Sequence, residues 1–566
     1  MKIKFPYLFF IFFFLFTFQF GQVYADVSGQ ERDFLLYGSF AEEGKDRSEA
    51  TLRLISKKAY FYVDNKYFNS LDKEKERNFF ISLQKLADEY DKRIYPILTN
   101  KFAKMAEPGI DGEDRVYILL LPLAEDVGGY TNTADGFFKK NVADGLTNEK
   151  DLVYINVNFL NSKKINGFLA HEIQHLISLQ NKEEKKGIFD DVWLNELRSE
   201  YALEFLGYNE SFSGSVLERR LSVFKKNPTD SLTEWRNKSE DYAVVNLFSH
   251  YLAEAYGEDI FKKMLISDDV GIKSINDALK KMGYLDNFKD VFRNWQIANY
   301  LNDTKVFGDR FGYKNKNLNF KIPPTLAQMI SEGEKEKAVF FQKDWQMAWL
   351  EYYGAAKFLT FKIESKDNIS LAYIFYNSDK SFSFGDVKLN NNKGSFSIKD
   401  FGSKVKSVIL LPFFTEKTSN FSDNEADRSF SLEISTDKND FSESGYEKLD
   451  FYLPEASLIR PAWSYDVYLV KGNFIRYISM PEFLNFYKEK KINILEREDF
   501  NRYKKSNLIR AIGDYRVYQI NEDGSKQWLD VGAEEFIKSG KSFLGVFEVT
   551  EKQMQMYKDG PKITKL

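Results

Sequence analysis

Two of the three histidines in this chain are four residues apart, and a glutamate directly follows the first: His171, Glu172 and His175 form an HExxH motif. Residues four apart lie on one face of an α-helix, so both imidazoles can reach one cation if this segment is helical. Zinc binds imidazole readily, and the glutamate then lies beside the metal as a candidate general base. The motif therefore predicts a helix over about residues 167–180 that carries a hydrolytic metal site.

A zinc ion that activates water needs a third protein ligand and one open coordination position. The chain has no cysteine, so this ligand must be an imidazole or an oxygen. Glu196 follows His175 by 21 residues, enough for a loop and an antiparallel second helix that starts near Trp193. We expect Glu196 to be the third ligand. Asp190 and Asp191, in the loop before that helix, are rival ligands.

The same predicted helix carries another acidic side chain one turn after Glu196. Glu200 lies on the same helix face. From there it can accept a hydrogen bond from the distal N–H of a zinc-bound imidazole and fix its tautomer. A plain exposed carboxylate is the alternative. We predict a supporting role for Glu200 beside the metal ligands.

The spacing of apolar residues changes along the chain. An amphipathic helix is expected from residue 71 to about residue 106, kinked or broken near Pro96, followed by buried strands at residues 115–121 and 152–156. Helices then continue to about residue 302, so this half is predicted to be mostly helical with a small sheet. Beyond about residue 320 the apolar residues alternate, which indicates a β-sandwich.

The last hundred residues repeat, because Leu458-Ile459-Arg460 recurs as Leu508-Ile509-Arg510. The sequence thus predicts an α+β chain of several domains. We expect a signal peptide, a catalytic domain, a β-sandwich and two small α/β repeats, at residues 1–25, 26–320, 321–445, 455–505 and 506–566. Residues 26–70 are either a short pro-segment or part of the catalytic core.

The first 25 residues have the features of an export signal. Lys2 and Lys4 precede an apolar run from Phe5 to Phe20, and small residues stand near the expected cleavage site after Ala25. A retained membrane anchor is the alternative, but the run is short for a spanning helix. The formal net charge of −4 provides no basic surface for nucleic acid. We expect a secreted or cell-surface protein that binds neither nucleic acid nor, after cleavage, a membrane.

The helix after the motif begins with Asn195-Glu196 and continues to Ser199-Glu200. An HExxH motif followed about twenty residues later by N-E-x-x-[SA]-[DE] resembles the gluzincin metallopeptidases. Within that clan the chain is most similar to the hyicolysin-like neutral metallopeptidases, over roughly residues 70–305. The resemblance implies a thermolysin-like catalytic domain, one Zn²⁺ ion per chain and hydrolysis of peptide bonds.

Leu197 and Arg198 depart from the aminopeptidase branch of this clan, which usually has glycine after the third-ligand glutamate. The size and charge of the pocket wall near the metal therefore stay open. The exopeptidase signature G-x-M-E-N of that branch is also absent, which favours an endopeptidase within the resemblance. Thermolysin-like clefts bind the substrate as an added strand, for which residues 152–156 or Gly129-Tyr130 are candidates.

The oxyanion that develops during hydrolysis needs an electrophile besides the metal. Tyr242, near the start of a later predicted helix, resembles the tyrosine that related peptidases use for this purpose. His250, about two turns further along that helix, is the rival donor. Each residue also has a structural alternative. Tyr242 is then a packing aromatic in a chain with 33 tyrosines, and His250 is a core or surface histidine whose hydrogen bonds are satisfied.

The C-terminal repeats resemble a tandem repeat found at the ends of bacterial surface and secreted proteins, which suggests attachment to the cell wall or surface. The leading hypothesis is a secreted or surface-displayed zinc endopeptidase that acts on protein or peptide substrates. A cell-surface binding or adhesion protein with a degenerate metallopeptidase domain is the alternative. A zinc hydrolase that acts on another amide or ester is a third.

Overall fold

The computed structural model describes most of the chain: residues 25–42, 44–125, 127–304, 306, 310–419, 423–442, 445–448, 453 and 456–566. The expected signal peptide, residues 1–25, lies outside the described residues apart from Ala25. Within the described ranges, no helix is long and apolar enough to span a bilayer. The chain divides into two compact units, Met1–Asp91 with Ala106–Ile165 and Lys92–Met105 with Asn166–Leu566.

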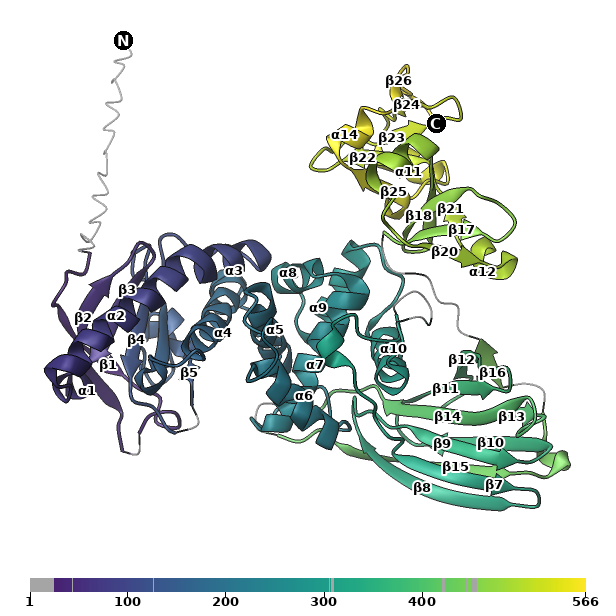
Figure 1. The fold of residues 1–566 in the computed structure, drawn as a ribbon, viewed down its shortest axis with the longest axis horizontal. Helices are drawn as coiled ribbons and strands as arrows, with labels where there is room; N and C mark the ends of the chain where they lie inside the picture. Colours follow the sequence, from purple (N-terminus) through teal and green to yellow (C-terminus); the bar gives the residue numbers. More distant parts are fainter. Residues whose placement is uncertain are drawn as a thin grey trace, which may run out of the picture. The chain divides into compact units, whose positions relative to one another are not determined.

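A six-stranded sheet forms the core of the first unit (Figure 1). In chain order its strands are β1 Glu31–Leu35, β2 Arg47–Ile55, β3 Ala59–Asp64, β4 Val116–Leu121, β5 Gly129–Tyr130 and β6 Leu152–Asn156. They lie in the order β1-β2-β3-β4-β6-β5, with β3, β4 and β6 parallel. Every residue of these three strands is buried, which is typical of parallel strands covered on both faces.

The first three strands place residues 26–70 in the folded core of this unit. Leu52, Tyr60 and Tyr62 are at most 1% exposed and belong to one hydrophobic cluster with β4 and β6. Asp26, the residue after the expected cleavage site, forms an ion pair with Arg32 and accepts a hydrogen bond from Tyr62. In this structure the segment therefore packs as part of the folded core.

The long helix expected before β4 is interrupted just before Pro96. After α1 Asn65–Asn69, helix α2 Lys73–Glu89 runs into a π-helical turn, Tyr90–Ile94, and then into α3 Tyr95–Lys101. Proline has no N–H and its ring crowds the preceding turn, which accounts for the irregular geometry there. The boundary between the two units falls in this same turn, and the helix ends at Lys101 rather than near residue 106.

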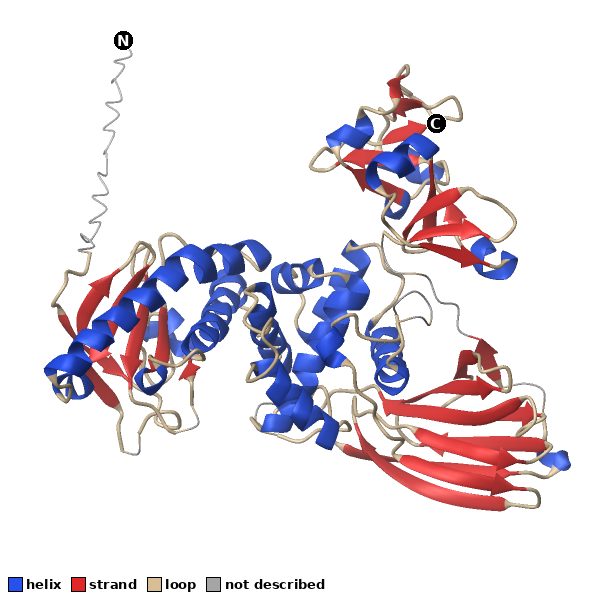
Figure 2. Ribbon diagram, in the orientation of Figure 1, coloured by secondary structure: helices blue, strands red, loops and turns tan. Residues whose placement is uncertain are grey.

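Helix α3 and helices α4 to α10 form the main helical part of the second unit (Figure 2, blue). Their bounds are α4 Ile165–Ser178, α5 Val192–Phe205, α6 Val216–Lys226, α7 Ser239–Tyr256, α8 Asp259–Ile266, α9 Gly271–Lys281 and α10 Phe288–Leu301. Both α5 and α6 pack against α7. The sequence predicted the motif helix and the helix after it close to these bounds, but it did not predict α6 and α8.

Two mainly antiparallel sheets form a β-sandwich after residue 320 (Figure 2, red). Its strands are β7 Leu326–Ser331, β8 Lys335–Lys343, β9 Leu350–Ala355, β10 Phe358–Ser365, β11 Ile369–Asn377, β12 Phe382–Val387, β13 Lys393–Lys399, β14 Val405–Phe414, β15 Asp427–Ser435 and β16 Tyr446–Lys448. The sheet orders are β13-β10-β15-β8 and β16-β12-β11-β14-β9-β7. Leu359, Phe361 and Ile363 alternate inward along β10 into a core that both sheets share, as the sequence pattern predicts.

The last part of the chain consists of two five-stranded sheets with the same strand arrangement. The first has the order β20-β17-β18-β19-β21 and the second β25-β22-β23-β24-β26. Their strands are β17 Leu458–Pro461, β18 Val467–Lys471, β19 Phe474–Ile478, β20 Ile492–Leu495 and β21 Lys504–Lys505, then β22 Leu508–Ala511, β23 Tyr518–Ile520, β24 Ser525–Trp528, β25 Val546–Val549 and β26 Lys558–Asp559. The repeated sequence thus corresponds to a repeated fold.

Candidate metal centre

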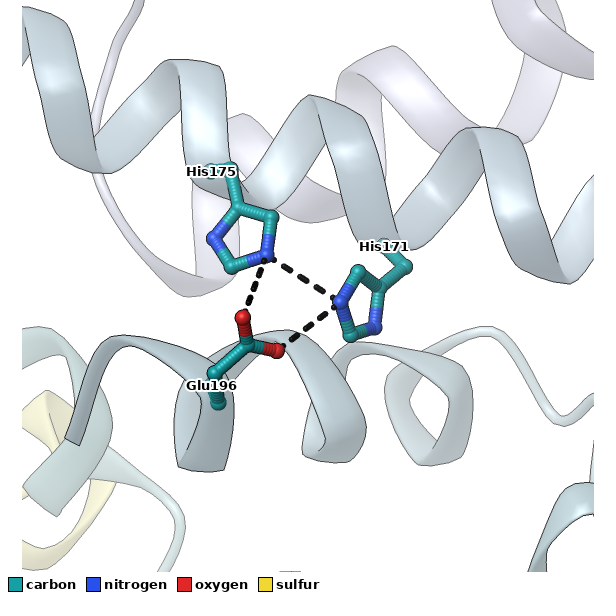
Figure 3. A group of neighbouring side chains, drawn as sticks. All are labelled: His171, His175 and Glu196. Atoms are coloured by element: carbon teal, nitrogen blue, oxygen red, sulfur yellow. Dashed lines mark hydrogen bonds and ion pairs between the residues drawn. The ribbon is translucent and has the colours of Figure 1, made fainter. Parts of the chain in front are cut away.

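Helices α4 and α5 bring two imidazoles and one carboxylate together (Figure 3). His171 Nε2 lies 3.1 Å from Glu196 Oε2, and His175 Nε2 lies 3.5 Å from Glu196 Oε1. The two Nε2 atoms are 3.1 Å apart. The side chains are 13–16% exposed, so solvent can reach the group.

These distances fit a zinc ion. Zinc bonds of about 2.0–2.1 Å in tetrahedral geometry place the ligand atoms about 3.3 Å from one another. The observed separations lie on either side of that value. Two imidazoles and one carboxylate are also a typical ligand set of hydrolytic zinc sites, which leave a fourth position for water.

The three side chains perturb one another strongly. Burial lowers the pKa of His171, but the hydrogen bond and charge of Glu196, with the charges of Glu172 and Glu200, raise it overall to about 9. Burial raises the pKa of Glu196, but the charge of His175 and the hydrogen bonds from both imidazoles hold it well below its usual value. The carboxylates therefore favour positive charge at this point, which either protons or a divalent cation can supply.

Glu200 is buried beside the metal-ligand candidates and is firmly held. It accepts two hydrogen bonds from Arg220, at 2.8 and 2.7 Å, and one from Asn246 Nδ2 at 3.1 Å. Its Oε1 lies 3.9 Å from His171 Nδ1, beyond hydrogen-bond distance. Burial raises the pKa of Glu200, but the neighbouring Arg220 guanidinium lowers it overall. Glu200 is therefore a buried, ionised carboxylate and not an exposed one.

Arg220 and Ser199 also support the group, and the sequence alone did not single out either for a role. Arg220 lies on α6, 20 residues after Glu200, and no motif marks it. Ser199 Oγ is 3.1 Å from His175 Nδ1 and donates to Gln174. The serine of the N-E-x-x-[SA]-[DE] pattern was the available signal for this contact.

The rival ligands Asp190 and Asp191 are directed elsewhere. Asp190 accepts a hydrogen bond from Arg198 at 2.8 Å and another from the Gly271 N–H at 2.8 Å. Asp191 accepts one from Trp193 Nε1 at 3.1 Å. Both carboxylates therefore have partners outside the group formed by the two imidazoles and Glu196.

The two residues that depart from the aminopeptidase pattern do not line a pocket. Leu197 and Arg198 are both 0% exposed. The Arg198 guanidinium is paired with Asp190, so its charge is neutralised inside the protein. Because both side chains are buried, neither contributes its size or its charge to the pocket wall near the metal.

Tyr242 and His250, the two candidate oxyanion donors, lie in different surroundings on α7. The Tyr242 hydroxyl donates to Asn237 at 3.0 Å, and the Arg220 guanidinium lies 4.4 Å from its ring. Burial raises the pKa of Tyr242, and the charge of Glu196 raises it further, which places the phenol within electrostatic reach of the site.

His250, in contrast, is 3% exposed, and its Nε2 lies 3.4 Å from Glu204 Oε1. Its ring packs edge-on against Tyr201, 5.4 Å away. Burial lowers the pKa of His250 to about 4, so the imidazole is neutral at pH 7. These surroundings favour a packing role for His250 over a role as the oxyanion donor.

Glu172, the candidate general base, is 6% exposed on the motif helix. Its charge contributes to the raised pKa of both His171 and Tyr242. The carboxylate therefore lies within electrostatic reach of a ligand candidate and of the nearer oxyanion candidate.

Of the two strands considered for substrate binding, one is internal to its sheet. β6 pairs with β4 on one side and with β5 on the other. β5, Gly129–Tyr130, is the last strand of that sheet. Of the two, only β5 has a partner strand on one side alone among the described residues, which leaves an edge to which a further strand can add.

Comparison with known protein sequences finds similarity to a metalloprotease. No known family model matches the chain. The neutral metalloprotease ShpI of Staphylococcus hyicus is 25% identical over 260 residues, which cover 42% of this chain and 55% of that protein. The chain thus spans little more than half the length of this relative.

Two solved structures resemble the chain more weakly. The pre-peptidase C-terminal domain of a Bacillus anthracis collagenase is 12% identical over 20% of this chain and 98% of that one, with a TM-score of 0.14. A metallopeptidase from Bacteroides thetaiotaomicron is 10% identical over 62% of this chain and 64% of that one, with a TM-score of 0.21. Both TM-scores are too low to carry an argument.

Proposed function

We propose that this chain is a zinc-dependent endopeptidase. One observation carries the proposal: two imidazoles from α4 and one carboxylate from α5 converge with the 3.1–3.5 Å separations that a tetrahedral zinc ion needs. The similarity to a neutral metalloprotease over 42% of the chain supports a metallopeptidase independently of this geometry.

His171, His175 and Glu196 would hold the zinc ion, with Glu200 and Ser199 behind the imidazoles. Such an ion acts as a Lewis acid on the scissile carbonyl and makes water acidic enough to react near neutral pH. Arg220 keeps Glu200 ionised and fixed in place, so the negative charge behind His171 does not move. The negative charge of Glu200, 3.9 Å from His171 Nδ1, makes the imidazole a more basic ligand through its electric field, without a hydrogen bond.

Glu172 is the general base of this proposal. It accepts the proton of the attacking water and then delivers it to the leaving amine, so one carboxyl group serves both steps. Its position on the same helix as the two histidines keeps its distance from them constant. Tyr242 donates a hydrogen bond from its hydroxyl to the developing oxyanion, and its high pKa keeps it protonated for this role.

The substrate class and the location belong to the same proposal. The chain lacks the exopeptidase signature G-x-M-E-N, which favours cleavage within protein or peptide substrates. The apolar N-terminal segment favours export, with action outside the cell or at its surface.

The test is a matched pair of glutamate variants. Purified protein should contain about one zinc ion per chain and cleave unfolded proteins internally, and a chelator should stop the reaction. Glu172→Gln should keep the zinc and lose the cleavage. Glu258→Gln, which alters an exposed glutamate at the N-cap of α8, should change neither. Zinc-loaded protein that cleaves none of a broad panel of peptides contradicts the proposal.

A further inference from the structure

The two C-terminal repeats expose a tyrosine at the same structural position. Tyr465 in the first repeat is 90% exposed and Tyr515 in the second is 81% exposed, the two largest values among the large hydrophobic side chains of the described residues. Single exposed apolar residues are common and need no explanation. The recurrence of such a residue at equivalent positions of a duplicated module, in contrast, needs an explanation.

Tyr465 lies at the tip of the turn between β17 and β18. The Ser464 N–H donates to the Pro461 carbonyl at 3.2 Å, and the Asp466 N–H donates to Ser464 Oγ at 3.1 Å. The second bond joins the Asp466 backbone to the Ser464 side chain, the two neighbours of Tyr465 in the chain. Such local bonds fix a turn without help from the rest of the fold.

Tyr515 lies at the tip of the corresponding turn between β22 and β23, and the same two bonds recur there. The Asp514 N–H donates to the Ala511 carbonyl at 3.0 Å, and the Arg516 N–H donates to Asp514 Oδ1 at 3.0 Å. The residues that form the bonds differ between the copies, but the geometry and the exposed tyrosine are the same. Two rigid turns therefore present two equivalent phenol rings to solvent.

Cations lie close to the aromatic rings of the first repeat. The Arg460 guanidinium is 5.4 Å from the Tyr465 ring, and the Arg497 guanidinium is 4.7 Å from the ring of Trp463, which is 46% exposed. Residues 456–566 carry 19 Lys and Arg against 15 Asp and Glu, whereas the whole chain has a net charge of −4. The repeats are thus the positive part of an acidic protein, which favours an anionic partner.

We propose that the two repeats bind an anionic polysaccharide, with one sugar ring stacked on each of Tyr465 and Tyr515. A tyrosine ring offers an apolar face and a polar hydroxyl, which match the C–H face and the hydroxyl edge of a sugar. In the first repeat, Arg460 and Arg497 pair with carboxylate or phosphate groups of the polymer. A partner of repeating structure is the kind that a duplicated contact fits, because linked contacts bind more tightly than single ones.

The experiment uses the intact protein and three probes: polygalacturonate, a short galacturonate oligomer and neutral dextran. Binding is measured by calorimetry and affinity electrophoresis for wild type, Tyr465→Ser, Tyr515→Ser and the double variant. Phe341→Ser, which removes a 78% exposed aromatic from the β-sandwich, is the matched control. Because all three side chains are exposed, circular dichroism should be unchanged in every variant.

Wild type should prefer polygalacturonate to dextran, lose affinity as salt rises, and bind the long polymer on the order of 10²-fold more tightly than the oligomer. Each single variant should remove most of this length advantage, and Phe341→Ser none of it. Equal binding of the long polymer by the double variant and wild type overturns the proposal. So does equal binding of dextran and polygalacturonate, or a change in oligomeric state as the only effect of the tyrosine variants.

Discussion

Among the described residues, two groups of three side chains place their ligand atoms within 4.8 Å of one another, and they differ in kind. The first, His171 with His175 and Glu196, joins two imidazoles to one carboxylate. The second, Asp230 with Glu234 and Asp241, consists of carboxylates only and is more deeply buried. Proximity is common to both, so it cannot by itself identify a metal site.

The second group is neutralised by the protein itself. Glu234 pairs with Arg236 and with Lys343, each at 2.6 Å, and Arg236 lies 3.4 Å from Asp230. Burial and the charge of Asp241 raise the pKa of Asp230 to about 7, and burial also raises the pKa of Asp241. Two cations and the raised pKa values of two of the three acids therefore leave little negative charge to attract a metal ion.

The first group has no such compensation. Among the described residues, Glu196 forms ion pairs with the two imidazoles and with no lysine or arginine. The comparison shows that the distance between ligand atoms distinguishes a metal site less well than whether its carboxylates are already paired with lysine or arginine. The predictions below test this difference, from the largest expected effect to the smallest.

Removal of one imidazole should separate the two groups most clearly. His175→Ala leaves two ligands, so we expect zinc content near zero and hydrolysis at background. Asp241→Asn should leave about one zinc per chain. The check is metal analysis of dialysed protein together with a peptide-cleavage assay. Loss of zinc in Asp241→Asn but not in His175→Ala would reverse the assignment of the two groups.

Loss of the general base should reduce the rate and leave the metal in place. For Glu172→Gln we expect kcat to fall on the order of 10²–10⁴-fold, because proton transfer from water loses its acceptor. Zinc content should stay at the wild-type level. Cleavage at the wild-type rate would remove Glu172 from the mechanism.

The two oxyanion candidates on α7 should differ in effect. Tyr242→Phe removes only the hydroxyl, and kcat should fall on the order of 10²–10³-fold with little change in KM. His250→Gln should alter kcat less than the tyrosine variant does, since His250 Nε2 faces Glu204. Steady-state kinetics on one peptide decides between them, and a larger effect at His250 contradicts the placement argued here.

The carboxylate behind the histidines should tune metal affinity. Glu200→Gln keeps the shape but removes the charge that Arg220 stabilises, so zinc affinity should fall on the order of 10–100-fold. Competition with a chromophoric chelator measures it. Unchanged affinity would mean that Glu200 serves only the packing of α5 against α6.

The smallest effect concerns the second group and pH. The pKa of Asp230 is raised to about 7 in the folded protein, so the folded state holds a proton that the unfolded state releases near pH 4. Stability should therefore fall as pH rises from about 4 to about 7. Asp230→Asn removes this loss, on the order of 1–3 kcal/mol.

Because other groups titrate in the same range, the quantity to follow is the difference in thermal midpoint between Asp230→Asn and wild type. It should increase from pH 4.5 to about pH 7 and level off above that. A difference that is constant with pH would show that Asp230 is ionised throughout and that another charge compensates this group.

Spacing alone predicted the parts of the site that lie on two consecutive helices. The spacing of four from His171 to His175 fixes one helix face, and the spacing of 21 from His175 to Glu196 allows a short return. Arg220 could not be found this way, because an arginine reaching Glu200 from another helix leaves no local pattern. Contacts of that kind depend on tertiary packing rather than on periodicity.

The fold shows the same limit. Strands β4 and β6 were predicted because they are continuous apolar runs. β2, Arg47–Ile55, was missed because its buried positions include Ser48 and Thr51, which do not read as apolar. In α6 the buried Leu217, Leu221 and Phe224 have helical spacing, but the charged residues between them mask the signal.

The most direct test of the metal centre is anomalous diffraction at the zinc edge from crystals of the protein purified without chelator. We predict one strong peak bonded to Nε2 of His171 and His175 and to the Glu196 carboxylate, at about 2.0–2.2 Å. A peak among Asp230, Glu234 and Asp241 instead, or a zinc ion bound with Glu196 turned away, would contradict the account.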